Sequence, residues 1–273
     1  VLTWQEGATH VTVERSLKKT YIQTLLDNFV PEVYGTVNNY HAIQLLQNKK
    51  SMLQKVEDLI IYGDLTYSAS SLEFDGLHAI AQEYNVNDAG ESLNIDENGA
   101  LSLTNLRLIE DRMRHGIDFW LFPKAIARRL DAYVQEGGLV STPSLQMRFS
   151  FGVDQLGKRV TFWNGVPIIR SDYLVLETDG TGVGSNARAK STAGTTYSIF
   201  AIKLGQVMQQ DPGLSFGIGH TPAAGQLWKQ VMFADLEDYD AAGLRLIGYY
   251  GLLDGSSMCK ARIYDITVSA VFP

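Results

Sequence analysis

The chain has 273 residues, of which 45% are hydrophobic, so it can bury a sizeable core in one large domain or two closely coupled ones. Its formal net charge is −7 and its basic residues are scattered, which argues against a protein that grips nucleic acid by neutralising many phosphates. The single cysteine, Cys259, excludes a disulfide framework and indicates a reducing, cytoplasmic setting, and no apolar run approaches the roughly 20 residues that span a bilayer.

The first 37 residues are predicted to form an extended arm. Residues 11–15 alternate apolar and polar side chains, and Pro31 and Gly35 interrupt the pattern before a helix begins. Because such a ribbon has too little apolar surface to order itself, residues 1–20 are expected to contact a neighbouring chain more than their own. Charged side chains of both signs would supply these intersubunit contacts: Glu6, Glu14, Arg15, Lys18 and Lys19. The alternative is an ordinary edge hairpin of the same domain.

A long amphipathic pattern over residues 38–62 predicts a helix of about 35 Å. Asn38 and Asn39 can cap its beginning, and Gly63 can adopt the left-handed conformation that ends it. Its apolar side chains recur at spacings of three, four and seven residues, at Ala42, Leu46, Leu53, Val56 and Ile60. One broad face of this helix is therefore expected to pack against the rest of the protein.

Residues 77–240 mix helix and strand patterns, which predicts an α+β domain with a central sheet flanked by helices. Ser102 caps one helix that Gly116 stops, and Pro123 opens another that ends at residues 137–138. Short runs rich in apolar residues predict strands at residues 117–122, 146–151, 160–163, 166–169, 173–177, 197–204 and 214–218.

Two further segments complete the chain. Residues 180–196 are dominated by Gly, Ser, Thr and Ala and are expected to form an exposed loop, placed near a symmetry axis or on the surface of an assembly. Residues 244–271 contain two strand patterns around Asp254 and Gly255, which predicts a hairpin.

No catalytic, cofactor or metal site is predicted. The glycines of residues 180–184 lack the following helix that a phosphate site needs. Residues 94–99 resemble the start of a calcium loop but lack its first carboxylate and its closing glutamate, so an Asn-Gly turn is expected. The five histidines have no metal-ligand spacing, and Cys259 is expected to be a buried small apolar residue.

Four blocks of the sequence occur in an order that resembles one family. They read KKSMLQKVEDLIIYGD followed by SLEFDGLHAIAQE, then LSLTNLRLIEDRMRHGIDFWLFPKAIARRL, then VTFWNGVPIIRSDYL, and finally FADLEDYDAAGLRLIGYYGLLDGSSMCKARIYDITV. These blocks resemble the spine helix, the helix–strand–helix unit, the Gly-x-Pro-Ile strand pair and the terminal strands of tailed-bacteriophage major capsid proteins with the Hong Kong ninety-seven fold. No single block is diagnostic, so the resemblance rests on all four together.

The resemblance implies an α+β phage capsid fold in three parts. Residues 1–30 would be the extended E-loop arm that lies across a neighbouring subunit. Residues 31–76 and 241–273 would form the peripheral domain with the spine helix, and residues 77–240 the axial domain with its central sheet. The terminal strands would return beside the spine helix.

That arrangement implies a specific packing of the long helix. Leu53 and Val56 are expected to lie against Ile263 and Ile266 of the returning strands. Some relatives also join an E-loop lysine to an asparagine of a neighbour. Lys18 and Lys19 lie in a plausible region for such a bond, but no partner asparagine is identified, so no crosslink is predicted.

The resemblance implies a structural protein and not an enzyme. It would be the major capsid subunit of a virion, assembled in the host bacterial cytoplasm into hexamers and pentamers of an icosahedral head. The head would enclose double-stranded DNA without specific binding, and scaffold, portal and decoration proteins are candidate partners. The alternatives are an encapsulin-type nanocompartment shell, which would enclose cargo enzymes, and a soluble α+β enzyme.

Overall fold

The computed structural model describes residues 18–27, 40–65, 73–83, 86–137, 149–153, 159–177, 194–206, 211–218, 229–233 and 241–272. Several of the predicted features lie outside these residues. They are the arm before Lys18, with Glu6, Glu14 and Arg15, the helix caps Asn38 and Asn39, and most of the loop at residues 180–196.

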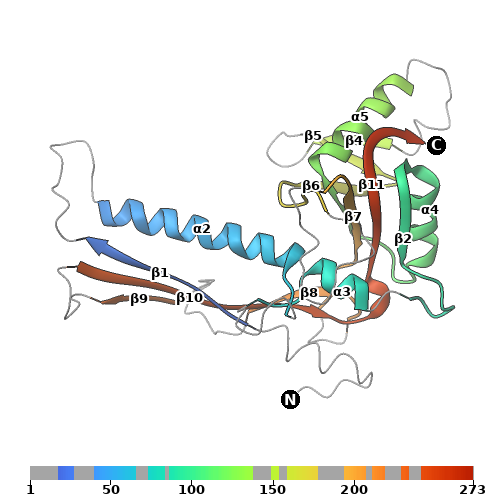
Figure 1. The fold of residues 1–273 in the computed structure, drawn as a ribbon. Coiled ribbons are helices and arrows are strands. Elements are labelled where there is room, and N and C mark those ends of the chain that lie inside the picture. Colours follow the sequence, from blue (N-terminus) through green and yellow to red (C-terminus); the bar gives the residue numbers. More distant parts are fainter. Residues whose placement is uncertain are drawn as a thin grey trace.

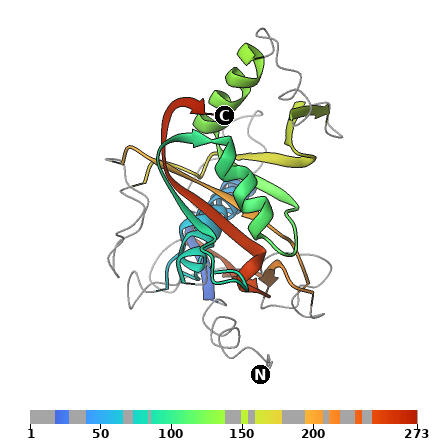
Figure 2. The same ribbon diagram turned by 90° about the vertical axis from the view of Figure 1, so that its right-hand side faces the viewer.

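The described chain is a mixed α+β protein with two sheets, as predicted (Figures 1 and 2). Its helices are α2 (Tyr40–Tyr62), α3 (Leu77–Glu83), α4 (Leu103–Arg112), α5 (Lys124–Gly137) and the short 3-10 helix η3 (Ser257–Cys259). The four-stranded sheet contains β1 (Lys18–Asp27), β8 (Leu214–Ile218), β9 (Lys229–Phe233) and β10 (Ala241–Asp254). The seven-stranded sheet contains β2 (Asn94–Ser102), β3 (Phe119–Pro123), β4 (Phe149–Val153), β5 (Arg159–Trp163), β6 (Val166–Ser171), β7 (Tyr197–Ile202) and β11 (Lys260–Phe272).

The four-stranded sheet is built on the long strand β10. Strand β1 pairs antiparallel with its first ten residues, β9 flanks part of its other edge, and β8 pairs with its last five residues. Figure 1 shows α2 lying along this sheet, so that helix and strands form an elongated arm. Val56 and Leu59 of the helix belong to one hydrophobic cluster with Leu246 and Tyr250 of β10. Of the apolar set predicted for the helix, Val56 packs on β10 whereas Leu46 and Leu53 stay exposed, so the buried face is shifted towards Met52 and Leu59.

The seven-stranded sheet forms the body of the molecule, with strand order β2-β11-β7-β3-β6-β5-β4. Its strand β11 runs parallel to β2 and antiparallel to β7, and β3 runs antiparallel to β7 and parallel to β6. Helices α4 and α5 pack against this sheet. Trp120, Phe122 and Trp163 are fully buried in its core. A central sheet flanked by helices is the architecture that the sequence predicts.

The predicted hairpin near Asp254 is wrong, because β10 and β11 belong to different sheets. Figure 1 shows β10 running along the arm and β11 turning away into the body. The Asp254 carboxylate accepts a hydrogen bond from the backbone N–H of Ser256, and η3 follows, so the chain makes a corner there. Asp-Gly chemistry predicts a turn but carries no information about which strands the two flanking segments join.

The predicted packing of Leu53 and Val56 against Ile263 and Ile266 is also wrong. Val56 is buried, but Leu53, one turn before it, is 46% exposed. Ile263 and Ile266 lie in the core of the seven-stranded sheet and do not share a cluster with Val56. The physical reason is the corner described above, which takes β11 away from the helix and leaves β10 to cover it.

Most local predictions agree with the structure to within a few residues. Ser102 caps α4 by accepting a hydrogen bond from the backbone N–H of Thr104, and α5 ends at Gly137. Residues 173–177 do not form a strand, apart from one bridge between Glu177 and Thr196. Residues 94–99 form the first part of β2 and not a simple turn, because β11 pairs with them across a register irregularity.

Candidate assembly surfaces and the junction that orients them

Arm and body meet at a buried cluster of polar side chains. Its members come from five segments: Tyr62 at the end of α2, His78 in α3, Glu177 after β6, Ser198 in β7 and Arg262 in β11. Arg262 and Glu177 are each 1% exposed. Burial of charged groups requires partners, and the cluster supplies them from both parts of the molecule.

The Glu177 carboxylate is the acceptor at the centre of this cluster. Its Oε2 atom lies 2.9 Å from Arg262 Nη2 and accepts a hydrogen bond of 2.6 Å from the Ser198 hydroxyl. Its Oε1 atom accepts one of 2.9 Å from the Tyr62 hydroxyl. Ser198 Oγ in turn accepts from Arg262 Nε at 3.0 Å, which fixes the plane of the guanidinium. A charged pair held by this many hydrogen bonds specifies one geometry.

Local backbone structure positions Glu177 for this role. Glu177 and Thr196 form an isolated antiparallel bridge, in which the Glu177 N–H donates to the Thr196 carbonyl at 2.8 Å. A Cβ atom on Gly194 would lie 2.1 Å from the Glu177 carbonyl oxygen. Only glycine allows the two backbone segments to approach this closely.

The cluster shifts the pKa values of its members. Burial alone would raise the pKa of Glu177, but the contact with His78 and the charge of Arg262 outweigh burial and lower this pKa to about 2. Burial lowers the pKa of His78, whose Nε2 atom lies 3.7 Å from Glu177 Oε2. Burial also raises the pKa of Tyr62. At neutral pH the junction therefore holds a carboxylate, a guanidinium and a neutral imidazole.

Acid is expected to weaken the junction. In the unfolded chain His78 binds a proton near pH 6.5 and Glu177 near pH 4.5, whereas in the folded subunit both stay unprotonated to lower pH. Because the unfolded state binds more protons, the free energy of unfolding should fall as the pH falls from about 7 towards about 3. Urea unfolding at several pH values measures this, and His78→Gln should remove the decline that begins near neutral pH. An identical pH profile for this variant would contradict the assignment to His78.

A second buried cluster holds the corner between β10 and β11. Lys260 forms an ion pair with Asp254, and both side chains are buried. The Cys259 thiol donates to Asp254 Oδ1 at 3.0 Å. Burial, assisted by the charge of Asp254, raises the pKa of this thiol, so it stays protonated. The prediction that Cys259 is buried is confirmed, and its contacts make it part of the structure of the corner.

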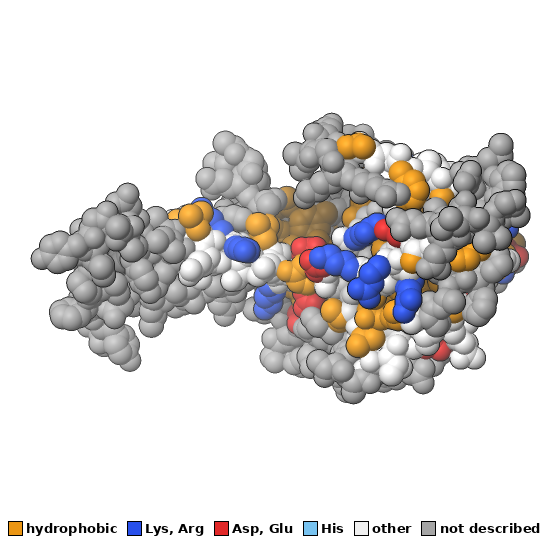
Figure 3. Space-filling model, turned by 90° about the horizontal axis from the view of Figure 1, so that it is seen from above, with side chains coloured by type: hydrophobic (Ala, Val, Ile, Leu, Met, Phe, Trp, Pro, Cys, Tyr) orange, Lys and Arg blue, Asp and Glu red, His pale blue; other side chains and the backbone are white. Residues whose placement is uncertain are grey.

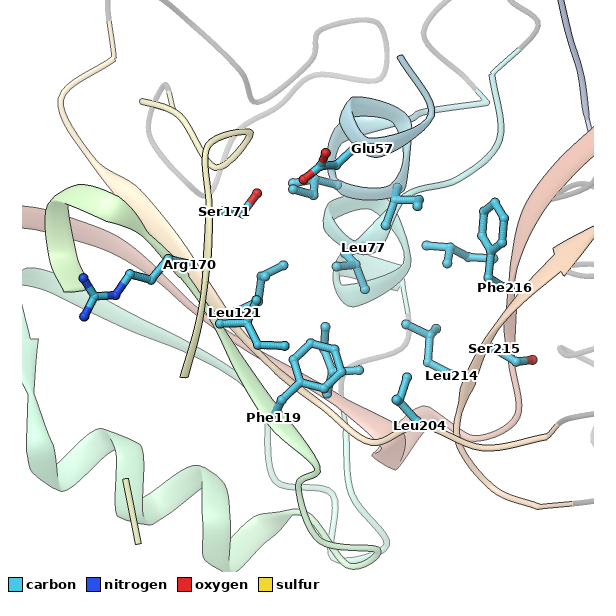
Figure 4. A pocket seen from close by; sticks show the side chains of 15 residues that line it. Glu57, Leu77, Phe119, Leu121, Arg170, Ser171, Leu204, Leu214, Ser215 and Phe216 are labelled. Atoms are coloured by element: carbon cyan, nitrogen blue, oxygen red, sulfur yellow. The ribbon is translucent and has the colours of Figure 1, made fainter. Parts of the chain in front are cut away.

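An apolar groove opens beside the junction, where the end of α2 faces β3, β6 and β8 (Figure 4). Its volume is about 280 Å³. Phe119 and Leu121 of β3 form one side and Leu214 and Phe216 of β8 another, with Glu57 at the edge. Three apolar side chains of the lining stay substantially exposed, Phe216 at 38%, Ile169 at 46% and Leu204 at 51%. Exposed apolar side chains gathered in a groove are typical of a binding surface.

Of the contact residues predicted from the sequence, only Lys18 and Lys19 belong to the described part of the chain, and neither is among the residues of the groove or of the junction. Lys18 and Lys19 are the first residues of β1 and pair through their backbones with Tyr250 and Tyr249 of the same chain. Glu6, Glu14 and Arg15 lie outside the described residues. Their contact with a neighbouring chain stays a prediction.

Sequence reasoning missed the junction residues altogether. Glu177 and Arg262 are 85 positions apart, and neither belongs to a recognisable motif. The available signal was a single charged residue inside each of two otherwise apolar strand-like runs, around residues 173–177 and 261–263. A charge inside such a run indicates a buried partner, but it does not identify that partner.

Two structural observations bear on other classes of site. Within the described part of the chain, no cluster of three or more His, Cys, Asp or Glu side chains is arranged to hold a metal ion. None of the helices in that part combines the length and the apolar character that crossing a bilayer demands.

Comparisons with known proteins identify the fold. No protein-family model matches the chain, and no curated protein is similar to it. Among solved structures, the SrpI encapsulin of Synechococcus elongatus PCC 7942, determined as the holo complex, matches with a TM-score of 0.65 and 16% identity, over 94% of this chain and 76% of the encapsulin chain. The capsid of Cyanophage P-SCSP1u matches with a TM-score of 0.54 and 11% identity, over 91% of this chain and 72% of the capsid chain.

The chain has the Hong Kong ninety-seven fold. The match extends over both the arm and the body, so it includes the long helix α2 as well as the seven-stranded sheet. At identities of 16% and 11%, the comparison establishes the fold and not the function. The resemblance of the four sequence blocks is thereby confirmed at the level of architecture.

Proposed function

We propose that this chain is a structural subunit that assembles with copies of itself into the icosahedral head of a tailed phage, around double-stranded DNA. The observation that supports this most is the similarity of fold, over more than nine tenths of the chain, to an encapsulin and a phage capsid. Hexamers and pentamers of one subunit would close the shell in the host cytoplasm. Scaffold, portal and decoration proteins of the same head are the expected partners.

The proposed mechanism is geometric. A closed shell requires that each subunit presents its contact surfaces at a constant angle, since small errors accumulate around the symmetry axes. The Tyr62 hydroxyl at the end of α2 donates to Glu177 of the body, which pairs with Arg262, and the pair of Asp254 and Lys260 holds the corner of the chain. Buried ion pairs contribute little net stability, but in some proteins they favour one packing over its alternatives. Their role here would be to hold the angle between arm and body.

The proposed domains take account of the two sheets. Residues 1–30 would form the E-loop arm, whose strand β1 pairs with β10, and α2 with β8, β9 and β10 would form the peripheral domain. The axial domain would comprise residues 77–206 together with β11, which belongs to the seven-stranded sheet. Residues 31–76 and 241–254 would remain peripheral.

A structural role also accounts for the perturbed carboxylate. Glu177 has a strongly lowered pKa, which is a common property of catalytic groups. However, Glu177 is 1% exposed and accepts hydrogen bonds from Ser198 and Tyr62, so no substrate can reach it in this structure. Its chemistry is that of a buried structural anion.

An encapsulin-type nanocompartment shell is the second candidate. The higher of the two TM-scores belongs to the encapsulin, at 0.65 against 0.54 for the phage capsid. The same assembly logic would apply, but the interior would hold protein cargo in place of DNA. The apolar groove beside Leu204 and Phe216 would then be a surface to test for cargo binding.

Electron microscopy of the purified protein tests the proposal. Expression of the chain, alone and together with its neighbouring genes, is expected to yield closed particles of uniform diameter. Nuclease-resistant DNA inside particles would favour the phage head, and protein-filled or empty small shells would favour the nanocompartment. A protein that stays monomeric under both conditions would contradict both.

A further inference from the structure

The exposed side of α2 carries a regular stripe of side chains, of which only Ile60 at its end packs against the core of the same subunit. Leu46, Lys50, Leu53, Glu57 and Ile60 follow one another at steps of four, three, four and three residues, so they share one face of the helix. Leu46 is 66% exposed and Leu53 is 46% exposed. A single exposed leucine is ordinary. Here two exposed leucines lie seven residues apart on one face of the helix, with Lys50 between them and Glu57 one turn after the second, and this is a regular pattern.

The stripe leads directly into the apolar groove. Glu57, Ile60 and Ile61 line the groove on its helix side, together with β3 and β8. Figure 3 looks down on this side of the molecule, and hydrophobic and basic side chains alternate along the arm towards a hollow with hydrophobic walls. Figure 4 shows Glu57 at the edge of the same hollow. The stripe on α2 and the apolar groove therefore belong to one continuous surface.

The stripe can pair with the stripe of a second copy that runs in the opposite direction. If a second α2 lies antiparallel with its position 54 opposite position 53, then Lys50 stands opposite Glu57, and Leu46 lies at the groove end of the partner helix, one position beyond its Ile60. By symmetry each of these contacts occurs twice, and the two Leu53 side chains meet near the axis. The apolar side chains of the stripe of each copy would fill the apolar groove of the other, with one ion pair between Lys50 and Glu57 on either side of the two-fold axis.

We infer that two copies of this chain associate through an antiparallel pair of α2 helices across a two-fold axis near Leu53. The inference rests on the proposed function, because it specifies one of the contacts between subunits of the shell. The charge order favours a second copy as the occupant, because in the antiparallel arrangement each Lys50 faces a Glu57. A parallel arrangement would instead place Lys50 against Lys50 and Glu57 against Glu57. Leu46 entering the groove supplies the apolar burial, and the ion pairs supply the register.

A cysteine at the axis tests the geometry. In the Leu53→Cys variant, the two introduced thiols would face each other across helices about 8–10 Å apart, within reach of a disulfide after slight adjustment. Mild oxidation of the purified protein should yield a disulfide-linked dimer on non-reducing gels. Leu46→Cys is the matched control, because its two copies would be separated by about 22 Å along the helix axes at 1.5 Å per residue. Cys259 is buried and does not compete.

Charge reversal tests the register. Added to the Leu53→Cys variant, Lys50→Glu and Glu57→Lys should each reduce the yield of the disulfide-linked dimer at least several-fold, because each places like charges opposite one another. The double reversal should restore the yield, since it exchanges the partners of both ion pairs. Both positions are exposed on the helix, so these variants should fold, which circular dichroism would verify.

The outcomes separate this inference from the proposed function. Closed particles without a Leu53→Cys dimer would overturn the α2 contact and leave the shell intact. A dimer in a protein that never forms particles would support the contact and contradict the shell. Failure of the double reversal to restore the dimer would overturn the register.

Discussion

Replacing Arg262 with methionine is expected to lower the free energy of unfolding of the isolated subunit by about 3–5 kcal/mol. The substitution removes the cation that faces Glu177, while that carboxylate stays 1% exposed with Ser198 and Tyr62 as hydrogen-bond partners and the neutral His78 nearby. An uncompensated buried charge carries most of this penalty, and the loss of the methylene packing of arginine is small because methionine replaces it. Urea unfolding followed by circular dichroism measures the change.

Two comparisons make this result specific to the buried pair. The double variant Arg262→Met with Glu177→Gln should recover a large part of the loss, because it leaves no charge to compensate. Lys203→Met, which breaks the partly exposed pair with Asp118, should lower stability by no more than about 1 kcal/mol. If Arg262→Met were no more destabilising than Lys203→Met, the junction would not carry the role assigned to it.

Replacing Gly76 with alanine is expected to destabilise the subunit by more than about 3 kcal/mol. A Cβ atom there would lie 2.6 Å from the Leu59 carbonyl oxygen and 2.8 Å from the Gly63 nitrogen. These are backbone atoms at the end of α2, so they cannot move aside without breaking the contact in which the Gly76 N–H donates to the Gly63 carbonyl at 2.8 Å. Thermal unfolding of the isolated subunit measures the effect.

Gly116→Ala is the matched control for this steric argument. Gly116 has φ of +78°, but nothing lies within 4 Å of the position that a Cβ atom would take, so alanine there meets only the left-handed backbone conformation. That conformation costs about 1–2 kcal/mol for a residue with a Cβ atom. Equal losses of stability for the two variants would show that the close approach of backbone segments at Gly76 does not contribute to the stability of the subunit.

The local elements of this protein follow from the sequence. Residues 214–218 form strand β8 where the pattern of apolar residues predicts it, and α5 ends at Gly137 as its glycines indicate. The helix α2 extends to Tyr62, directly before Gly63. These features depend on backbone preferences and on periodic apolar residues, which act over a few neighbouring positions and can therefore be recognised in one dimension.

The candidate sites could not be predicted in the same way. The helix pattern includes both Leu53 and Val56 in its apolar set, yet Val56 is 9% exposed against 46% for Leu53, because β10 covers only one side of α2. The apolar groove combines side chains of α2, β3, β6 and β8, none of which is adjacent in sequence. Which apolar residues remain exposed depends on the placement of other elements.

The sequence by itself determined where most helices and strands form, the α+β class, and an order of blocks that indicates the Hong Kong ninety-seven fold. Only the tertiary structure decided that β11 leaves the arm for the seven-stranded sheet, and that Glu177 meets Arg262. Local preferences of the chain do not encode such pairings. Those pairings follow from the mutual burial of surfaces and from the requirement that every buried charge finds a partner, and both depend on the whole fold at once.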